Sequence, residues 1–309
     1  MRWRSRLNQN ILPFCSFDYP LKDLTTLGVG GPAECFARPA TRHELLSVLN
    51  FCVKEGLPVW LLGGGSNVLI PDEGLRGITI QTRGMNGVMW EEKGDSVLLE
   101  VEAGVTLAAL LSLSIERGWS RLEFVAGIPG SVGGALRGNA GVEGRALGDL
   151  VESVLLINNE GLLQWEKRGD IRFSYRFSDL LEKNKAIVAC RLLLAKEDTG
   201  VVAHTAGKYF DKRAGQPKGV RTAGCLFKNP EAGFAGKILD DAGCKGLRQG
   251  DAEVSRIHAN FIVNTGSAGS KDILRLISLC RERVYQETGI LLELELCVMG
   301  EFPHGEVCG

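Results

Sequence analysis

Cys225 has the most distinctive chemical surroundings of any residue in this sequence. It lies in the run Gly224-Cys-Leu-Phe-Lys-Asn-Pro230, at the end of a segment in which six basic residues accompany a single acid, Asp211. A thiol close to cations has a lowered pKa, so Cys225 could act as a nucleophile or as a proton donor. A small core residue is the equally open alternative, because free cysteine is often buried.

Arg176 and Glu295 are two further polar residues that could take part in chemistry. Arg176 ends the run Ser174-Tyr-Arg176, after a predicted hairpin, where an arginine is ordinarily a solvated surface charge. Glu295 lies where leucines at 292, 294 and 296 alternate with Glu293, Glu295 and Cys297. That alternation is typical of a half-buried strand whose glutamates face solvent. Both residues therefore also have an ordinary structural explanation.

Two glycine-rich runs indicate a ligand that carries phosphate. The segment Gly127–Gly141 holds six glycines in fifteen residues, and Gly63-Gly-Gly-Ser-Asn67 follows a predicted buried strand. Glycine costs backbone entropy and buries no side chain, so the longer run is not expected to form a packed helix or strand. Such runs suit a backbone that approaches a charged ligand. Asn67, Ser131 and Asn139 add side-chain donors for a diphosphate. Neither run matches a Walker loop or a Rossmann turn, and an ordinary tight turn is the alternative for Gly63–Asn67.

Composition excludes several classes of protein. The 309 residues suit two or three domains, and 36 basic against 37 acidic residues give no attraction to nucleic acid or anionic membrane. Nine scattered cysteines without a Cys-x-x-Cys pair indicate a reducing compartment, and isolated His43 and His258 give no metal site. The basic N-terminus is followed by Asn8, Asn10 and Pro13 rather than an apolar segment. We therefore expect a soluble, cytoplasmic protein without a membrane span.

The elements that must position these residues are of mixed type, so we expect an α+β fold. Thr41 and Glu44 form a capping box for a helix over 41–55 that ends at Gly56. Further helices are expected at 107–117, 235–242 and 270–288. Strands are expected at 57–62, 78–82, 97–102, 151–158, 162–166, 186–194, 259–265 and 290–299, with a hairpin turn at 158–161. A domain boundary is expected near residue 198.

Seven motifs in one order resemble those of a known family. They are Thr25–Pro32, Gly63–Asn67, Ala126–Gly134 with Asn139–Gly141, Ser174–Arg176, Ala223–Pro230, His258–Asn264 and Leu292–Glu295. Together they resemble the UDP-N-acetylenolpyruvoylglucosamine reductases, also called UDP-N-acetylmuramate dehydrogenases. The resemblance extends from about residue 20 to 300, and the short interval from Tyr175 to Gly224 is similar to the subclass without an extra tyrosine-bearing substrate loop.

The resemblance implies an enzyme of peptidoglycan precursor synthesis, with non-covalent FAD and with NADPH as co-substrate. It implies an FAD-binding domain of the p-cresol methylhydroxylase/vanillyl-alcohol oxidase type over 20–198, with subdomains at 20–80 and 81–198. An α+β domain over 199–303 would bind the UDP-sugar. The residues expected to hold FAD are Gly63, Gly64, Gly65, Ser66, Asn67, Gly130, Ser131, Gly133, Gly134, Asn139 and Gly141.

The resemblance also assigns roles to the three residues discussed first. Reduced flavin would give hydride to the enolpyruvyl group, Arg176 and a protonated Glu295 with a raised pKa would stabilise the resulting negative charge, and Cys225 would donate the proton. Many relatives have serine at that position, and a thiol is the stronger acid. The residues expected to bind the substrate are Tyr175, Lys208, Arg213, Lys228 and Asn229.

The sequence departs from the family at one position in the glycine segment. Glu143 stands where relatives often have tyrosine, which puts any contact from that position in doubt. Two alternatives remain open. One is another flavin oxidoreductase of the same superfamily that acts on an alcohol or aldehyde. The other is a nucleotide-binding regulatory protein that keeps the glycine runs but has lost the chemistry.

Overall fold

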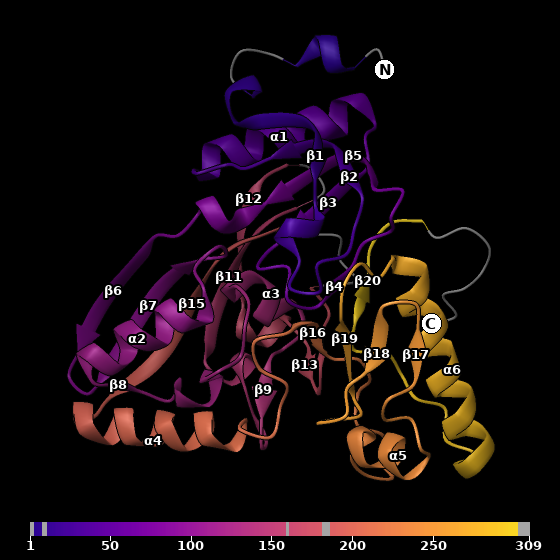
Figure 1. The fold of residues 1–309 in the computed structure, drawn as a ribbon. Coiled ribbons are helices and arrows are strands. Elements are labelled where there is room, and N and C mark those ends of the chain that lie inside the picture. The colour runs from indigo at the N-terminus through magenta and orange to yellow at the C-terminus, as the bar shows by residue number, and fades with distance from the viewer. Residues whose placement is uncertain (1–2, 8–10, 159–160, 181–185, 302–309) are drawn as a thin grey trace. The chain divides into compact units, whose positions relative to one another are not determined.

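The chain forms two compact units in the computed structural model, which describes residues 3–7, 11–158, 161–180 and 186–301 (Figure 1). Unit 1 comprises Met1–Ser16, Phe36–Gly64 and Thr79–Ala214. Unit 2 comprises Phe17–Cys35, Gly65–Ile78 and Gly215–Gly309. Each unit has its own core of buried apolar residues.

A four-stranded sheet has the order β1-β2-β5-β3. Its strands are β1 (Cys15–Pro20), β2 (Pro32–Ala37), β3 (Val59–Leu62) and β5 (Leu75–Gln81). The predicted strands at 57–62 and 78–82 correspond to β3 and β5 and are confirmed. Because β3 ends at Leu62, the first glycine run directly follows a strand, as expected.

The main sheet of unit 1 is antiparallel, with the order β12-β11-β15-β7-β6. Its strands are β6 (Val88–Lys93), β7 (Ser96–Glu102), β11 (Val151–Ile157), β12 (Leu163–Lys167) and β15 (Ala186–Lys196), with β8 (Trp119–Ser120) beside β15. The four strands predicted in this region are confirmed. β11 and β12 pair as the predicted hairpin requires, while residues 159–160 of its turn lie outside the described residues.

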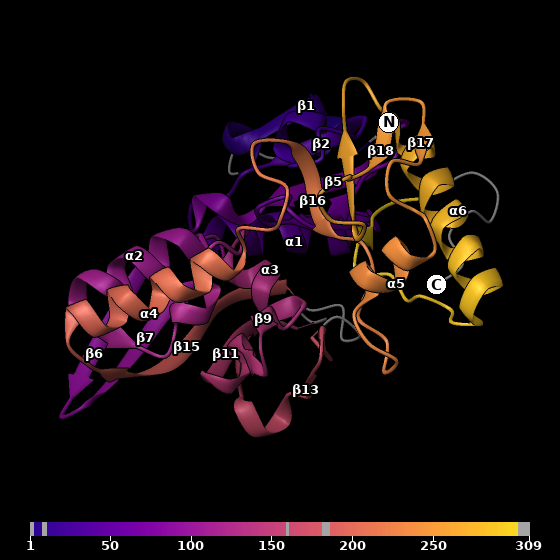
Figure 2. The same cartoon turned by 60° about the horizontal axis from the view of Figure 1, so that its bottom comes forward.

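One face of this sheet carries the core of unit 1. Val97, Leu99 and Val101 of β7 are buried because alternate side chains of a strand point to the same face. Helix α2 (Leu107–Arg117) contributes Leu107 and Leu110 to the same core. Helix α4 (Thr199–Lys212) lies beside α2 (Figure 2).

The helices with strong local signals begin and end where the sequence predicts. α1 (Arg42–Glu55) has the capping box of Thr41 and Glu44, and it ends at Gly56, whose φ of 62° is left-handed. α2 ends at Gly118 in the same way, with a φ of 67°. Left-handed residues at helix ends are usually glycine because a Cβ atom is disfavoured there.

The glycine-rich segment contains a short helix that the sequence did not predict. α3 (Val132–Arg137) begins after Ser131, whose side chain accepts a hydrogen bond from the N–H of Gly134. Val132 and Leu136 are buried in the core of unit 1. The expectation that this composition excludes a helix is therefore wrong for these residues, because a serine cap and two buried apolar side chains outweigh the glycines.

The cationic stretch also begins in a helix that the sequence did not predict. α4 (Thr199–Lys212) is capped by Asp198, which accepts hydrogen bonds from the N–H groups of Gly200 and Val201. Val202 and Ala206 form its buried stripe. α4 lies in unit 1, whose last residue is Ala214, and the domain boundary expected near residue 198 stays a prediction.

Unit 2 combines a four-stranded sheet with two helices. The sheet has the order β16-β19-β18-β17, formed by β16 (Arg221–Cys225), β17 (Arg248–Gln249), β18 (Ala252–Val254) and β19 (Phe261–Asn264). The helices are α5 (Ala235–Asp241) and α6 (Ser270–Thr288). Both helices and the strand predicted at 259–265 are confirmed.

The predicted final strand is wrong over most of its length. Of residues 290–299 only β20 (Cys297–Val298) is a strand, and it pairs in parallel with β4 (Val68–Leu69). Upstream of it, the N–H groups of Glu295 and Leu296 both donate to the carbonyl of Leu226. In a regular strand, two consecutive N–H groups do not share one acceptor, so the hydrogen-bond pattern of a strand is interrupted here. The alternation of leucines therefore predicted a strand that does not form.

No helix among the described residues is long and apolar enough to cross a membrane.

Candidate active site

The two glycine runs meet within unit 1. A Cβ atom at Gly63 would lie 2.4 Å from Oγ of Ser131, and one at Gly64 would lie 2.8 Å from Cα of Gly130. Backbone cannot move aside as a side chain can, so the packing of the two runs requires glycine at position 64, whereas at position 63 the Ser131 hydroxyl would have to move. The glycines therefore serve the mutual packing of the runs as well as any ligand.

The rest of the first run, Gly65–Asn67, belongs to unit 2. Gly65 has a φ of 67°, and a Cβ atom there would lie 1.9 Å from the carbonyl oxygen of Leu24. Its own carbonyl accepts a hydrogen bond of 2.9 Å from the N–H of Thr26. This contact explains why the Thr25–Pro32 motif accompanies the glycine run, a link that the sequence alone did not suggest.

The start of α3 is tied to the turn that follows β7. The N–H of Val132 donates to the carbonyl of Val105, and the N–H of Gly133 donates to that of Ala103. Ser131 is buried at the helix N-terminus. The structure thus explains these residues by packing, and the predicted cofactor contacts of Ser131, Gly133 and Gly134 stay predictions.

Asn139 bridges two loops of unit 1. Its Nδ2 donates to the carbonyl of Ser174 (2.8 Å), and its Oδ1 accepts from the N–H of Gly148 (2.9 Å). Only 6% of the residue is exposed, and its φ is 42°. The predicted cofactor contact of Asn139 stays a prediction, while the amide clearly holds the loop that carries Arg176.

Arg176 occupies a strained turn. The two-residue strands β13 (Phe173–Ser174) and β14 (Phe177–Ser178) pair antiparallel, so Tyr175 and Arg176 form the turn between them. Arg176 has a φ of 53°, which is uncommon for a residue other than glycine. Its Nη1 donates to the carbonyl of Gly141 (3.1 Å), and its guanidinium lies 5.7 Å from the centre of the Tyr175 ring. Such strain is often found at functional sites.

Cys225 lies at the end of β16 in unit 2, directly after a bulge. The register shifts between the pairs Thr222–Val263 and Cys225–Phe261, and Gly224 within the bulge has a φ of 80°. A bulge redirects the side chain that follows it, and the Cys225 thiol is partly exposed. The sequence identified the glycine but not the bulge.

Asn260 fixes the backbone that follows Cys225. Its Oδ1 accepts from the N–H of Phe227 (2.9 Å), and its Nδ2 donates to the carbonyl of the same residue (2.8 Å). The carbonyl of Asn260 accepts from the N–H of Leu226. The sequence placed Asn260 in a family motif without giving it a role, because only the fold brings it to this segment.

Glu295 lies on the segment beside Cys225. The N–H of Glu295 donates to the carbonyl of Leu226 (2.7 Å), and Phe227 and Leu294 form an antiparallel bridge. On the other side, Nδ2 of Asn67 donates to the carbonyl of Glu295 (2.9 Å). Unit 2 therefore brings together, on neighbouring segments, the predicted residues Asn67, Cys225 and Glu295.

The cationic residues predicted to bind substrate are divided between the units. Lys208 is exposed on α4, and the aliphatic part of Arg213 lies close to Gly127 in unit 1. Lys228 of unit 2 forms an ion pair with Glu293, and its side chain is 21% exposed. Asn229 caps α5 by accepting a hydrogen bond from the N–H of Ala235 (2.9 Å). Their substrate contacts stay predictions.

Glu143, the departure from the family pattern, has a partner on α4. Its carboxylate forms an ion pair of 2.6 Å with Nζ of Lys212. The charge that replaces a tyrosine is thus neutralised within unit 1, although both side chains are about half exposed. Exposed pairs of this kind contribute little stability.

His258 of unit 2 is half-buried, and burial, together with the positive charge of Lys245, lowers the pKa of its imidazole. Nδ1 accepts a hydrogen bond of 3.2 Å from the N–H of Asn260. The ring packs edge-on against Phe261 at 4.9 Å. His258 thus supports the Asn260 segment as a neutral side chain.

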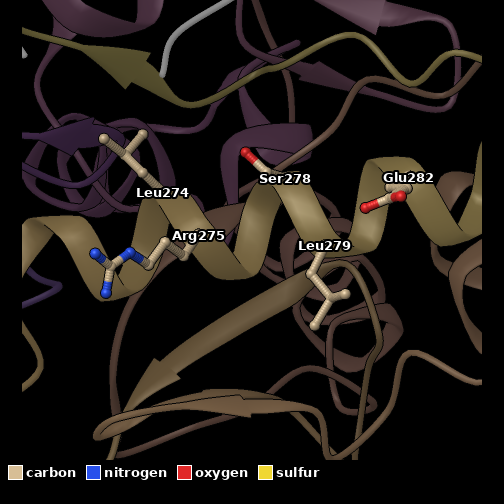
Figure 3. Close-up of a pocket in the computed structure, with 5 residues that line it drawn as sticks. All are labelled: Leu274, Arg275, Ser278, Leu279 and Glu282. Atoms are coloured by element: carbon tan, nitrogen blue, oxygen red, sulfur yellow. The ribbon is translucent and has the colours of Figure 1, made fainter. Parts of the chain in front are cut away.

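Two pockets of the structure are lined by residues other than those predicted for the site, although Thr106, in the lining of the second, forms a β-bridge with Ser131. One of about 290 Å³ is lined by one side of α6, with Leu274, Arg275, Ser278, Leu279 and Glu282 (Figure 3). One of about 350 Å³ in unit 1 is lined by Arg83, Asn86, Val88 and residues 104–113 of the α2 region. Neither contains a predicted site residue. Among the described residues, no cluster of histidine, cysteine, aspartate and glutamate could hold a metal ion.

Comparison with known proteins supports the order of the two functional regions. Residues 33–166 match the family model of an FAD binding domain, and residues 216–299 match that of the UDP-N-acetylenolpyruvoylglucosamine reductase, C-terminal domain. The fold class predicted from the sequence, α+β with an FAD-binding part followed by a family-specific C-terminal domain, is confirmed. The chain is an FAD-dependent oxidoreductase.

Similar proteins cover nearly the whole chain. The UDP-N-acetylenolpyruvoylglucosamine reductases of Moorella thermoacetica and Syntrophus aciditrophicus are 40% and 37% identical, over 91% and 92% of this chain and 92% of each relative. The crystal structure of UDP-N-acetylenolpyruvylglucosamine reductase from Thermus caldophilus is 36% identical, with a TM-score of 0.79 over 93% of this chain and 98% of that one. The chain belongs to the UDP-N-acetylenolpyruvoylglucosamine reductase family.

Proposed function

We propose that this chain reduces UDP-N-acetylenolpyruvoylglucosamine to UDP-N-acetylmuramate, a step in peptidoglycan precursor synthesis, with FAD as cofactor and NADPH as reductant. The names of its relatives support the substrate, and the FAD binding domain supports the cofactor. The observation that carries the proposal is that Cys225 and Glu295 lie on neighbouring hydrogen-bonded segments of unit 2.

The glycine runs fit the diphosphate of FAD. Gly63 and Gly64 put bare backbone against the second run, and the backbones of Gly127 and Gly134 are exposed. Bare backbone of this kind suits a diphosphate, which binds by many N–H donors. Bound there and reduced by NADPH, FAD would supply the hydride for the enolpyruvyl double bond. We assign its binding to Gly63–Asn67, Gly130, Ser131, Gly133, Gly134 and Gly141. Asn139 was also predicted to hold FAD, but its amide is engaged by Ser174 and Gly148, so we do not assign that side chain to the cofactor.

We assign the stabilisation of negative charge to Arg176 and Glu295. Hydride addition to the terminal carbon of an enol ether leaves negative charge beside the substrate carboxylate. A fixed cation and a hydrogen-bond donor lower the free energy of such a state when water is excluded. Arg176 is the cation, already held in one turn conformation, and Glu295 in its protonated form is the donor.

We assign the final proton to Cys225. The thiol transfers its proton to the carbon that bears the negative charge, and the thiolate then takes a proton from solvent. A thiol titrates at about 8.5, far below a serine hydroxyl, so the proton is more readily transferred. Tyr175, Lys208, Arg213, Lys228 and Asn229 are the proposed contacts of the substrate's phosphate and sugar groups.

The test is a purification followed by an assay of the proposed reaction. We expect a yellow protein that releases FAD on denaturation and oxidises NADPH faster when the enolpyruvyl UDP-sugar is added, with UDP-N-acetylmuramate as the product. A colourless protein that does not take up FAD would contradict the proposal. A flavoprotein that ignores the UDP-sugar would instead be an oxidoreductase with another substrate.

A further inference from the structure

The turn that carries Arg176 is tied to the end of the glycine-rich segment at two points. Nδ2 of Asn139 donates to the carbonyl of Ser174, directly before the turn. Within the turn, Nη1 of Arg176 donates to the carbonyl of Gly141. The two contacts involve residues only two positions apart in the segment, so the segment fixes both the backbone and the side chain of the turn.

Asn139 is itself held in place by a second set of contacts. Its Oδ1 accepts from the N–H of Gly148, whose carbonyl accepts from Nε of Arg168 (2.8 Å). A Cβ atom at Gly148 would lie 2.6 Å from Cγ of Phe173 and 2.9 Å from Oδ1 of Asn139. The guanidinium of Arg168 lies 4.9 Å from the centre of the Phe173 ring. These contacts leave the Asn139 amide one orientation.

Asparagine suits both the backbone conformation and the hydrogen bonds at position 139. Asparagine tolerates the left-handed backbone better than most residues, and φ is 42° here. Its amide offers one acceptor and one donor group, which Gly148 and Ser174 use. Aspartate could accept from Gly148 but could not donate to Ser174. Because Asn139 is buried, a polar group left there without a hydrogen-bond partner would lower the stability of the folded protein.

We propose that Asn139 is a positioning residue for Arg176: it holds the Tyr175–Arg176 turn where the guanidinium stabilises the reacting substrate. This inference rests on the proposed function, and it gives Asn139 a task that differs from binding the cofactor. A displacement of about 1 Å in a catalytic group can cost about 10²-fold in rate. Asn139 therefore acts on the reduction of the sugar and not on the reduction of the flavin.

The test is a double-mutant cycle with Asn139→Ala and Arg176→Ala, in which the two half-reactions are followed separately. In the otherwise unchanged protein, we expect Asn139→Ala to slow oxidation of the reduced flavin by the UDP-sugar by about 10²-fold. In the Arg176→Ala protein, the same change should slow it less than about 3-fold, because the effect passes through Arg176. In each variant, the FAD content and the rate of flavin reduction by NADPH should remain within about 3-fold of the values for the parent protein.

Asn139→Asp provides a second variant, since it keeps the acceptor for Gly148 and replaces the donor to Ser174 with a carboxylate oxygen that cannot donate. Ser114→Ala is a matched control, because Ser114 is buried and donates to the carbonyl of Trp119 elsewhere in unit 1. It should lose stability without slowing the sugar half-reaction. Additive losses in the cycle, or a loss of FAD instead of sugar reduction, would overturn the inference. A parent protein that does not reduce the UDP-sugar would overturn the proposed function instead.

Discussion

At the scale of single residues, Arg176 combines a strained backbone with the guanidinium that we assign to charge stabilisation. Its φ of 53° costs a residue with a Cβ atom about 1–2 kcal/mol, and glycine avoids most of that cost. We therefore predict that Arg176→Gly is more stable than Arg176→Ala by about 1 kcal/mol, while both lose most of the sugar reduction. Urea unfolding and the sugar half-reaction measure the two effects.

Arg121 provides the control for this prediction. It also has a left-handed backbone, with a φ of 88°, and its Nη1 donates to the carbonyl of Leu193. The glycine and alanine variants of Arg121 should differ in stability in the same direction, yet both should retain activity. Equal stabilities of the glycine and alanine variants at both positions would show that the backbone strain is absent.

Cys225 should be the thiol whose alkylation stops the reaction. It is partly exposed, whereas burial raises the pKa of the Cys190 thiol and so suppresses its reactivity. Iodoacetamide should abolish sugar reduction in the parent protein, while Cys225→Ser should remain active after treatment. Cys297→Ser is the comparison, since Cys297 is also partly exposed and lies in the same unit. If Cys297→Ser, rather than Cys225→Ser, resisted the reagent, the assignment of Cys225 would be wrong.

At the scale of elements, local signals predicted structure well and distant contacts did not. α1 and α2 follow from caps and stop residues a few positions away, so their ends are readable from the sequence. The strand expected over 290–299 fails because its pairing depends on Leu226, far away in the chain. The same distance hides the adjacency of Cys225 and Glu295, which the sequence supplied only through the family resemblance.

Gly64 tests how the glycine runs pack as elements. A Cβ atom there meets backbone atoms, 2.8 Å from Cα and 3.2 Å from the carbonyl carbon of Gly130, and backbone cannot move aside as a side chain can. We predict that Gly64→Ala lowers the free energy of unfolding by about 1–3 kcal/mol and reduces the FAD content.

Gly207→Ala is the matched control for this change. Gly207 lies on α4, where an added Cβ atom would meet nothing within 4 Å. Since alanine favours a helix over glycine, this variant should gain up to about 1 kcal/mol and keep its FAD. The packing of the runs would be wrongly described if Gly64→Ala behaved like Gly207→Ala in unfolding and flavin content.

At the scale of the whole molecule, stability should depend on the protonation of His258. Burial and the charge of Lys245 lower its pKa below the ordinary value of 6.5. Below pH 6.5 the unfolded chain then binds more protons than the folded chain, so the stability of the folded protein falls as the pH falls. Above pH 6.5 this residue does not affect the stability. We predict a weaker loss between pH 6.5 and about 5 for His258→Gln, measured by urea unfolding.

Glu100, a partly buried carboxylate with a shifted pKa, titrates below the pH range of this measurement. Burial alone would raise the pKa of Glu100, but hydrogen bonds from Arg42 and Arg191 outweigh it and hold the pKa below 4.5. Its contribution is therefore lost only at lower pH. An unchanged pH profile in His258→Gln would contradict the role given to this histidine.

The central claim is that this enzyme reduces the enolpyruvyl UDP-sugar with a proton from Cys225. Its most direct test is stopped-flow measurement of both half-reactions in the parent protein, in Cys225→Ala and in Cys225→Ser. We expect NADPH to reduce the flavin at a similar rate in all three proteins. The UDP-sugar should reoxidise the flavin in the parent and serine proteins but not in the alanine protein. Fast reoxidation of the flavin by the UDP-sugar in Cys225→Ala would contradict the claim.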